Sequence, residues 1–319
     1  MKIFAKKLLY LIIMLFIISL ISFIAINAAP NSFFASGQLN PNITEESIAQ
    51  LKAIYGLDKP LYVQYFSWLI AMVQLDFGIS FASGSQVKEE ILSRIPITLT
   101  INIISMVFIF FISLYLGIKA ALNKNSFFDR FTGQLSLLSF SMPSFYLALL
   151  LVLIFAINFE VLPIAGLHSV PDDGSLTYYL DFAWHLILPI SIIIFSGIGS
   201  LTLYIRSLTI EILKSDYIFF AKARGLNNKQ ILRYYILPNL YPPVITLLGL
   251  SLPGIIGGSV ILETIFSIDG MGLLFFQSAL AHDYPVIMGI LIIGAFLTLL
   301  GNILADLVLL KLNPNYDGK

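Results

Sequence analysis

The segment LLYLIIMLFIISLISFIAINA, residues 8–28, contains no charged side chain along its whole length. It is as long as the roughly 20 apolar residues that a helix needs to cross about 30 Å of hydrocarbon. Five more segments of similar length and few or no charges follow, at 98–118, 135–159, 182–205, 241–262 and 286–309. The sequence therefore predicts an all-α membrane protein with six transmembrane helices.

The composition agrees with this class and excludes several others. The chain is 58% hydrophobic and 11% charged, whereas soluble domains have about 45–50% and about 25%. The net charge is zero and cysteine is absent, which argues against a nucleic-acid partner, a disulfide framework and cysteine zinc sites. We expect a lipid environment, no metal site and no cofactor.

The basic residues predict the orientation, because Lys and Arg near span ends stay in the cytoplasm. They gather at 2–7, 119–130, 206–233 and 311–319, and none lies between 130 and 206 or between 233 and 311. Both termini are therefore expected in the cytoplasm. The basic residues within 30–97 are an exception, but long translocated loops largely escape the rule.

Residues 1–97 form the first predicted division, an N-terminal helix with an outer segment. Lys6 and Lys7 followed by an apolar run also resemble a signal peptide, but the run exceeds the usual length of about 7–15 residues, so we expect a retained helix. In the outer segment, Thr44 is placed to cap a helix that Gly56 would close. The aromatic stretch 61–75 is too short to span. It either lies along the outer membrane face or forms the core of a small external subdomain.

Residues 98–312 form the second division, a five-helix core, and 313–319 form a tail. Within the core, the loop 206–240 stands out because it holds six of the eighteen basic residues. We predict a helix over 207–224, a left-handed Gly225 after it, and a second helix to 236 that Asn227 or Asn228 caps. Three prolines are expected to end that second helix: Pro238, Pro242 and Pro243.

The two loop helices carry side chains that are too apolar to be left in water. These are Tyr217, Phe219, Phe220, Ile231, Leu232, Tyr234 and Tyr235. At about 25 cal/mol per Å² of apolar surface, burying a few of them against a protein partner supplies several kcal/mol. The alternative is an amphipathic hairpin that rests on lipid headgroups.

The spacing of four loop residues resembles a known motif. Ala221, Gly225, Leu237 and Pro238 match the EAA loop of binding-protein-dependent ABC transporter permeases, although Phe219 and Phe220 replace its usual Glu and Ala. The resemblance implies that this loop docks an ATPase subunit. It assigns that role to Ala221, Ala223, Arg224, Gly225, Leu226, Leu237 and Pro238.

The resemblance covers nearly the whole chain and is greatest to the dipeptide and oligopeptide permeases with their nickel and glutathione relatives. The matching segments are GLDKPL at 56–61, DFGIS at 76–80, PSF at 143–145, LP at 162–163, GMG at 270–272 and DYP at 283–285. Two departures are Asp269, where the family usually has proline, and the ending Asn313-Pro314-Asn315.

Membership of this family implies the type I ABC importer fold and a location in the bacterial inner membrane. The implied partners are a second homologous permease, cytoplasmic ATP-binding subunits and an extracytoplasmic solute-binding protein. The implied substrates are short peptides, with nickel chelates or glutathione as alternatives. The chain has no G-x-x-x-x-G-K-[ST] motif, so we expect a transport subunit without its own ATPase site.

The second hypothesis is a secondary carrier or channel that needs no ATPase. Ion-coupled carriers usually keep ionisable groups near mid-membrane, whereas Glu263, Asp306 and His185 lie near the ends of the predicted spans. Glu263 is either functional or a solvated boundary residue, and Asp306 is expected to pair with Lys311. This distribution of charges argues against proton or sodium coupling.

Some residues are candidates for the transport pathway or its gate. They are Pro143, Gly258, Glu263, Gly270 and Gly272. Glycines in the fifth span and at its outer end serve either close helix packing or a flexible pore wall. The three histidines, at 168, 185 and 282, map to the outer side. Ordinary surface positions are expected for them, with a nickel path as the alternative.

Overall fold

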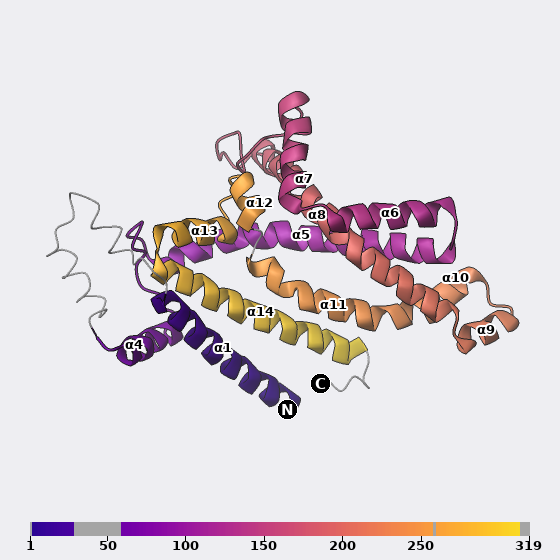
Figure 1. Ribbon diagram of the computed structural model, residues 1–319, viewed down its shortest axis with the longest axis horizontal. Helices are drawn as coiled ribbons and strands as arrows, with labels where there is room; N and C mark the ends of the chain where they lie inside the picture. The colour runs from indigo at the N-terminus through magenta and orange to yellow at the C-terminus, as the bar shows by residue number, and fades with distance from the viewer. Residues whose placement is uncertain (1, 29–58, 258–259, 313–319) are drawn as a thin grey trace. The chain divides into compact units, whose positions relative to one another are not determined.

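The computed structural model describes residues 2–28, 59–257 and 260–312, and these parts are helical apart from loops and one isolated bridge between Ile79 and Gln86 (Figure 1). The chain divides into two compact units. The first comprises Met1–Thr98, Ile256–Val260 and Asp269–Leu300, and the second comprises Leu99–Ile255, Ile261–Ile268 and Gly301–Lys319. Each unit is described separately below.

The described parts of the six predicted spans are mostly helical. They lie on α1 (Lys2–Ala28), α5 (Val87–Leu122), α6 (Phe127–Ser141) with its continuation, α8 (Leu176–Leu213), α11 (Leu237–Gly257) with α12 (Val260–Ile265), and α14 (Tyr284–Leu312). Among the described residues, three helices are long and apolar enough to cross a membrane alone, and a bent pair makes a fourth if it counts as one span. The helical membrane class is confirmed, and six spans are consistent with it.

The predicted span over 135–159 is a bent pair of helices. α6 ends at Ser141, and α7 (Ser144–Leu151) begins after Pro143 and continues as the π-helical η1 (Val152–Asn158). The two directions differ by 100°. Proline has no backbone N–H and disfavours helical backbone in the residue before it, and Met142 is accordingly extended, with ψ 122°. Pro143 was named from the sequence as a pathway candidate, and the bend was not predicted.

In the first unit, the aromatic stretch forms α4 (Leu61–Val73), which packs on α1. The contact centres on Tyr65, whose hydroxyl lies 2.9 Å from Ser19 Oγ and whose ring meets Phe23 edge to face. The other large apolar side chains of α4 are mostly exposed, which argues against a buried external core and favours the membrane-face prediction. The helix predicted between Thr44 and Gly56 lies outside the described residues.

Two segments that carried the family resemblance meet in the first unit. The carboxylate of Asp283, just before α14, accepts a hydrogen bond from Ser80 Oγ at 2.5 Å and from the N–H groups of Phe81 and Ala82 at 3.1 Å each. Asp283 is buried, and a buried carboxylate needs such donors to offset its lost hydration. The buried carboxylate of Asp283 therefore joins the DFGIS segment, residues 76–80, to the DYP segment, residues 283–285.

Asp269, which stands where the family usually has proline, forms an ion pair in this unit. Its carboxylate lies 2.8 Å from Arg94 Nε, close to the start of α13 (Met271–Ala281). The N–H of Met271 then donates to Thr98 Oγ1 at 2.9 Å. Because the Asp269 side chain is largely exposed, we expect this ion pair to contribute little stability.

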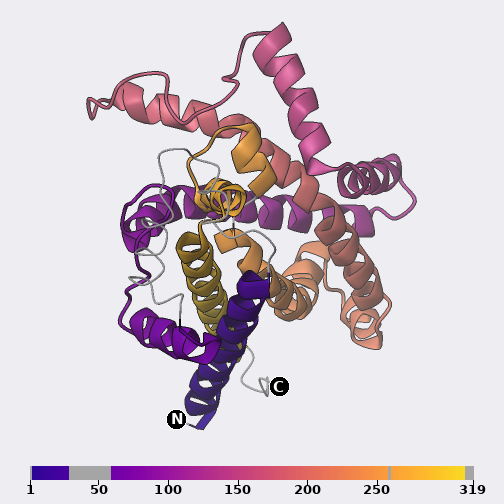
Figure 2. The same cartoon turned by 60° about the vertical axis from the view of Figure 1, so that its left-hand side comes forward.

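In the second unit, α6 and α8 approach each other so closely that their backbones nearly touch (Figures 1 and 2). The hydroxyl of Ser139 on α6 donates to the carbonyl of Phe195 on α8 and accepts from the N–H of Gly199 at 3.1 Å. A Cβ atom at Gly199 would lie 2.4 Å from the carbonyl oxygen of Ser136. Only glycine permits this approach, as small residues do in other membrane helix pairs.

Replacing Gly199 with alanine tests this contact. We expect Gly199→Ala to destabilise the purified protein by about 1–3 kcal/mol, because the added methyl group must push two backbones apart. The matched control is Gly133→Ala on α6, where a Cβ would meet nothing within 4 Å and helix propensity alone favours alanine. The midpoint of thermal unfolding in detergent should fall for the first variant only. Equal midpoints for the two variants would contradict the close approach.

Candidate functional site

The loop predicted at 206–240 forms a helical hairpin in the second unit. α8 runs on to Leu213, and after a short break come α9 (Asp216–Ala223), α10 (Asn228–Ile231), the π-helical η2 (Leu232–Ile236) and then α11. The predicted continuous helix over 207–224 is therefore wrong. Ser215 is extended, with ψ 150°, and its hydroxyl donates to the carbonyl of Ile212 at 2.5 Å. That bond satisfies the end of α8 and separates it from α9.

The turn between the two helices of the α9–α10 hairpin, residues 216–236, confirms the predicted glycine conformation. Gly225 has φ +81°. Its N–H donates to the carbonyl of Lys222 at 2.9 Å, and the N–H of Leu226 donates to that of Ala221 at 3.2 Å. This pair of bonds is the Schellman arrangement that ends a helix at a left-handed residue. The side chain of Asn227 then caps α10, in a capping box with Gln230.

The prolines after the hairpin do not end a helix, which corrects the prediction made for them. Instead, η2 passes directly into α11, and Pro238, Pro242 and Pro243 all lie inside α11. The N–H of Leu237 donates to the carbonyl of Leu232, five residues back. Such π-helical turns accommodate an interruption of the ordinary helical bonding. Pro238, at the start of α11, has no N–H to contribute there.

One face of the hairpin is part of the hydrophobic core of the second unit. Ile218 and Ala221 of α9 are fully buried, and they belong to one cluster with Ile205 and Ile212 of α8. Ile118, Ile231, Ile236, Leu240 and Val244 complete that cluster. Ala221 is thus a packing residue and not an exposed contact, and the expectation that Ile231 needs an outside partner is wrong for the same reason.

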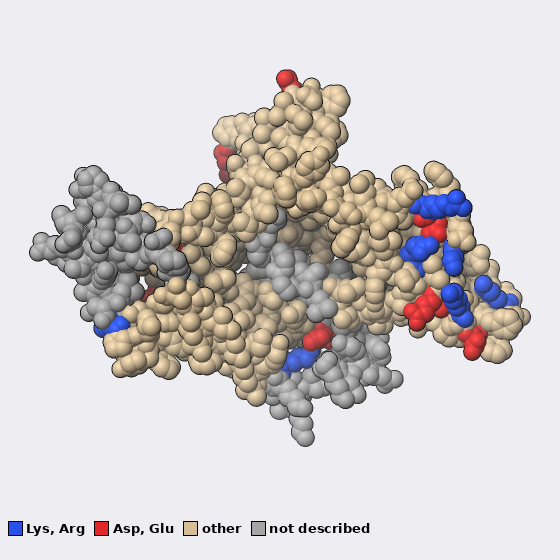
Figure 3. Space-filling model, in the orientation of Figure 1, with Lys and Arg blue, Asp and Glu red and all other residues tan. Residues whose placement is uncertain are grey.

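The opposite face of the hairpin exposes aromatic side chains. Phe219 and Phe220 are 69% and 62% exposed, and Tyr217 and Tyr234 are exposed as well. Of the sequence-predicted residues, Ala223, Arg224, Gly225 and Pro238 are exposed, while Leu226 and Leu237 are half-buried. Figure 3 shows that Lys, Arg, Asp and Glu gather at the end of this unit that carries α9 and α10. The hairpin is therefore packed on the core through one face and exposes an apolar face next to charged surface.

An ion pair that the sequence reasoning missed lies close to the hairpin in the chain. Arg206 Nε and Nη2 on α8 donate to the two carboxylate oxygens of Asp129 on α6, at 2.5 and 2.8 Å. Asp129 is buried, and it also accepts the N–H of Asn125 at 2.9 Å. The hydrogen bond from Arg206 is the main cause that lowers the pKa of Asp129, against the opposing effect of burial. The pair is therefore ionised at neutral pH.

Two family models match the chain. The description "Binding-protein-dependent transport system inner membrane component" matches residues 113–318, which include the whole hairpin, and the N-terminal model of the same transport systems matches residues 1–102. The chain belongs to this family. It is a multi-pass membrane component of a transport system that depends on binding proteins.

Individual relatives of this permease align over nearly their full length. The oligopeptide transport system permease protein AppB of Bacillus subtilis is 35% identical over 94% of each chain. OppB of Haemophilus influenzae, described by the same function, is 35% identical over 98% of each. A permease protein of a metal-staphylopine import system in Staphylococcus aureus is 31% identical over 95% of this chain and 93% of its own.

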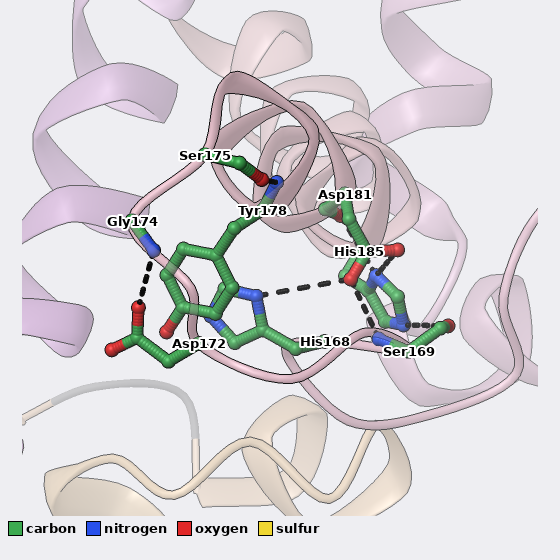
Figure 4. Close-up of polar contacts among 8 residues, drawn as sticks. All are labelled: His168, Ser169, Asp172, Gly174, Ser175, Tyr178, Asp181 and His185. Atoms are coloured by element: carbon green, nitrogen blue, oxygen red, sulfur yellow. Dashed lines mark hydrogen bonds and ion pairs between the residues drawn. The ribbon is translucent and has the colours of Figure 1, made fainter.

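Two of the three histidines of this permease, His168 and His185, contact neighbouring polar and aromatic residues (Figure 4). The ring of His168 stacks on that of Tyr178 with centroids 3.9 Å apart. Its Nδ1 lies 3.8 Å from Oδ2 of Asp181. His185 is buried, with Nδ1 2.8 Å from the carbonyl oxygen of Asp181 and Nε2 3.2 Å from Ser169 Oγ. The surface expectation is wrong for His185. Throughout the described residues, no group of three side chains is arranged to hold a metal ion.

The predicted pathway residues are spread over separate elements. Pro143 lies at the α6–α7 bend and Glu263 on α12 in the second unit, while Gly270 precedes α13 and Gly272 lies within it in the first unit. Glu263 is buried, so the solvated-boundary interpretation is wrong. Gly258 lies outside the described residues, and so does the Lys311 side chain that was expected to pair with Asp306.

Two alanines of α9, one buried and one exposed, allow a test of how this helix packs on the core. We expect Ala221→Leu to lower stability by about 1–3 kcal/mol, because the side chain would be forced into a filled core. Ala223→Leu is the matched control, since Ala223 lies on the same helix but is exposed. Thermal unfolding of the two purified variants measures the difference. If both melt like the wild type, α9 is not seated on the core as described.

Proposed function

We propose that this chain is one of two permease subunits of an ATP-driven importer and that the pair forms the membrane pathway for short peptides. The relatives described as oligopeptide permeases, which cover nearly the whole chain, support peptides as the substrate class. A metal chelate is the second candidate, because a metal-staphylopine import permease is similar over almost as much of the chain. A soluble binding protein outside the cell would deliver either substrate.

The observation that carries this proposal is the α9–α10 hairpin with its buried and exposed faces. Its buried face is anchored by Ile218 and Ala221, so that a force on the hairpin reaches the helices beneath it. Its exposed face offers Phe219 and Phe220. Aromatic anchors of this kind dominate the binding energy of many protein interfaces.

The partner at this face would be a cytoplasmic ATP-binding subunit. The chain has no phosphate-binding loop motif of its own, and in this proposal another protein supplies the energy for transport. The basic residues of the hairpin support a cytoplasmic position for it, with both termini on the same side. Closure of two ATPase subunits would then shift the permease pair between conformations through differential binding.

The pathway residues are part of the same proposal. Glu263 is a buried ionisable group at the end of an expected span, and such groups often mark the routes of transported solutes. Pro143 lies at a 100° bend, where a helix pair has an evident place to flex. Under the second hypothesis, an ATPase-independent carrier, the exposed aromatic face would rest on lipid headgroups, and the copurification experiment below distinguishes the two.

Removing the aromatic anchors tests the docking proposal. The transporter would be expressed with its ATP-binding subunits and purified in mild detergent through a tag on this chain. We expect the double variant Phe219→Ser with Phe220→Ser to lose about 2–4 kcal/mol of binding energy, as truncated interface anchors do. Recovery of the ATP-binding subunits should then fall well below the wild-type level.

The control for that experiment is Phe127→Ser. Phe127 is 85% exposed and belongs to the same unit but lies outside the hairpin. We expect the ATP-binding subunits to copurify with this variant as with the wild type. Full recovery with the double variant, or no recovery with the wild-type chain, would contradict the docking proposal.

A further inference from the structure

The Asp129–Arg206 pair lies where α8 leaves the predicted span and continues toward the hairpin. Two parallel N–H···O bonds join the guanidinium to the carboxylate, a fork geometry that fixes direction as well as distance. Asp129 is held from its own side too, because Ser126 caps α6 by accepting the Asp129 N–H. The pair thus connects the beginning of α6 rigidly to one point on α8.

The helices on both sides of this pair form a continuous mechanical path. α8 is a single helix from Leu176 to Leu213, so Arg206 moves with the residues just before the hairpin. The hairpin is packed on the same stretch of α8 through the cluster that contains Ile205 and Ile212. On the far side, α6 runs from Asp129 to the bend at Pro143, and Ser139 bonds it to α8 along the way.

We propose that Asp129 and Arg206 are positioning residues that transmit a displacement of the α9–α10 hairpin to α6 and to its bend at Pro143. This inference rests on the proposed function, because it takes the hairpin to be the place where the ATPase acts. The pair binds neither nucleotide nor substrate. It keeps α6 and α8 in register when the hairpin moves.

Stability alone is a poor explanation for this pair. Taking the Asp129 carboxylate out of water costs hydration energy, while Arg206 stays 27% exposed, and well-packed apolar side chains at such positions are often as stabilising. Buried ionic contacts are best known for fixing register between helices. A contact between helices that must shift together needs this directional property, which apolar side chains do not provide.

The test uses the complete transporter reconstituted in liposomes, with its binding protein. Two quantities are measured for each variant: the recovery of ATP-binding subunits on purification, and the ratio of binding-protein-stimulated to basal ATP hydrolysis. We expect Asp129→Asn to retain the ATP-binding subunits but to lower the ratio about fivefold or more, in the range of known coupling between sites. Arg206→Lys keeps the positive charge but cannot form the two parallel hydrogen bonds of the guanidinium. Its ratio of stimulated to basal ATP hydrolysis should therefore lie between those of the wild type and Asp129→Asn.

Two further variants complete the design. The exchange Asp129→Arg with Arg206→Asp restores a pair of opposite charges and should recover part of the ratio. Thr132→Val is the control, since Thr132 is buried on α6 near Asp129 and its hydroxyl has no hydrogen-bond partner among the described residues. It should leave both quantities unchanged.

The outcomes separate this inference from the proposed function. An unchanged ratio in both Asp129→Asn and Arg206→Lys would overturn the inference while leaving the docking proposal intact. Loss of the ATP-binding subunits from these variants would also overturn it, because the pair would then serve only the structure of the docking site. Failure of the wild-type chain to retain those subunits would instead overturn the proposed function.

Discussion

The close contact between α6 and α8 is the constraint on which the second unit depends. Inside a membrane there is little hydrophobic force between helices, so they associate through tight packing and hydrogen bonds between them. Gly199 allows the two backbones to approach, and Ser139 bonds across the gap in both directions. Arg206 and Asp129 close the same interface at one end. These contacts are what give α8 a fixed position from which the hairpin extends.

The position of the hairpin is fixed by α8 and by the hydrophobic cluster on which α9 packs. Under the proposed function, a hairpin that receives a force must be attached to the helices that move. Ala221 is small and fully buried, and this lets α9 lie directly on the core, while Phe219 and Phe220 on the neighbouring positions point outward. The alanine and the glycine of the motif therefore serve packing and backbone geometry, and the flanking aromatics are exposed.

The local features of the hairpin were predictable because neighbouring residues determine them. Gly225 was expected to be left-handed and Asn227 to cap a helix, and both follow from backbone chemistry within a few residues. The break at Ser215 was not predicted, although the bond from its hydroxyl to the carbonyl of Ile212 is local. The passage of η2 into α11, which keeps Pro238 inside a helix, was not predicted either. The burial of Glu263 and His185 was also not predicted, although the sequence places Asp181, which contacts His185, only four positions from it.

The Asp129–Arg206 pair was missed although the sequence contains a signal for it. The two residues are 77 positions apart, and no local pattern connects them. However, Asp129, Thr132, Ser136 and Ser139 are all buried and recur at helical spacing along α6. A buried polar stripe along a helix indicates a face that meets another helix, and a buried acid at its end requires a basic partner or hydrogen-bond donors.

The central claim is that the α9–α10 hairpin contacts an ATP-binding subunit. Because the chain contains no cysteine, a single cysteine can be placed at the exposed Ala223 and reacted, in membranes that hold the whole transporter, with a linker that carries a maleimide and a photoreactive group. Ala223→Cys should give a covalent product with the ATP-binding subunit, and Asp172→Cys, in the exposed loop before α8, should not. No product from Ala223→Cys, or an equal product from Asp172→Cys, would contradict the account.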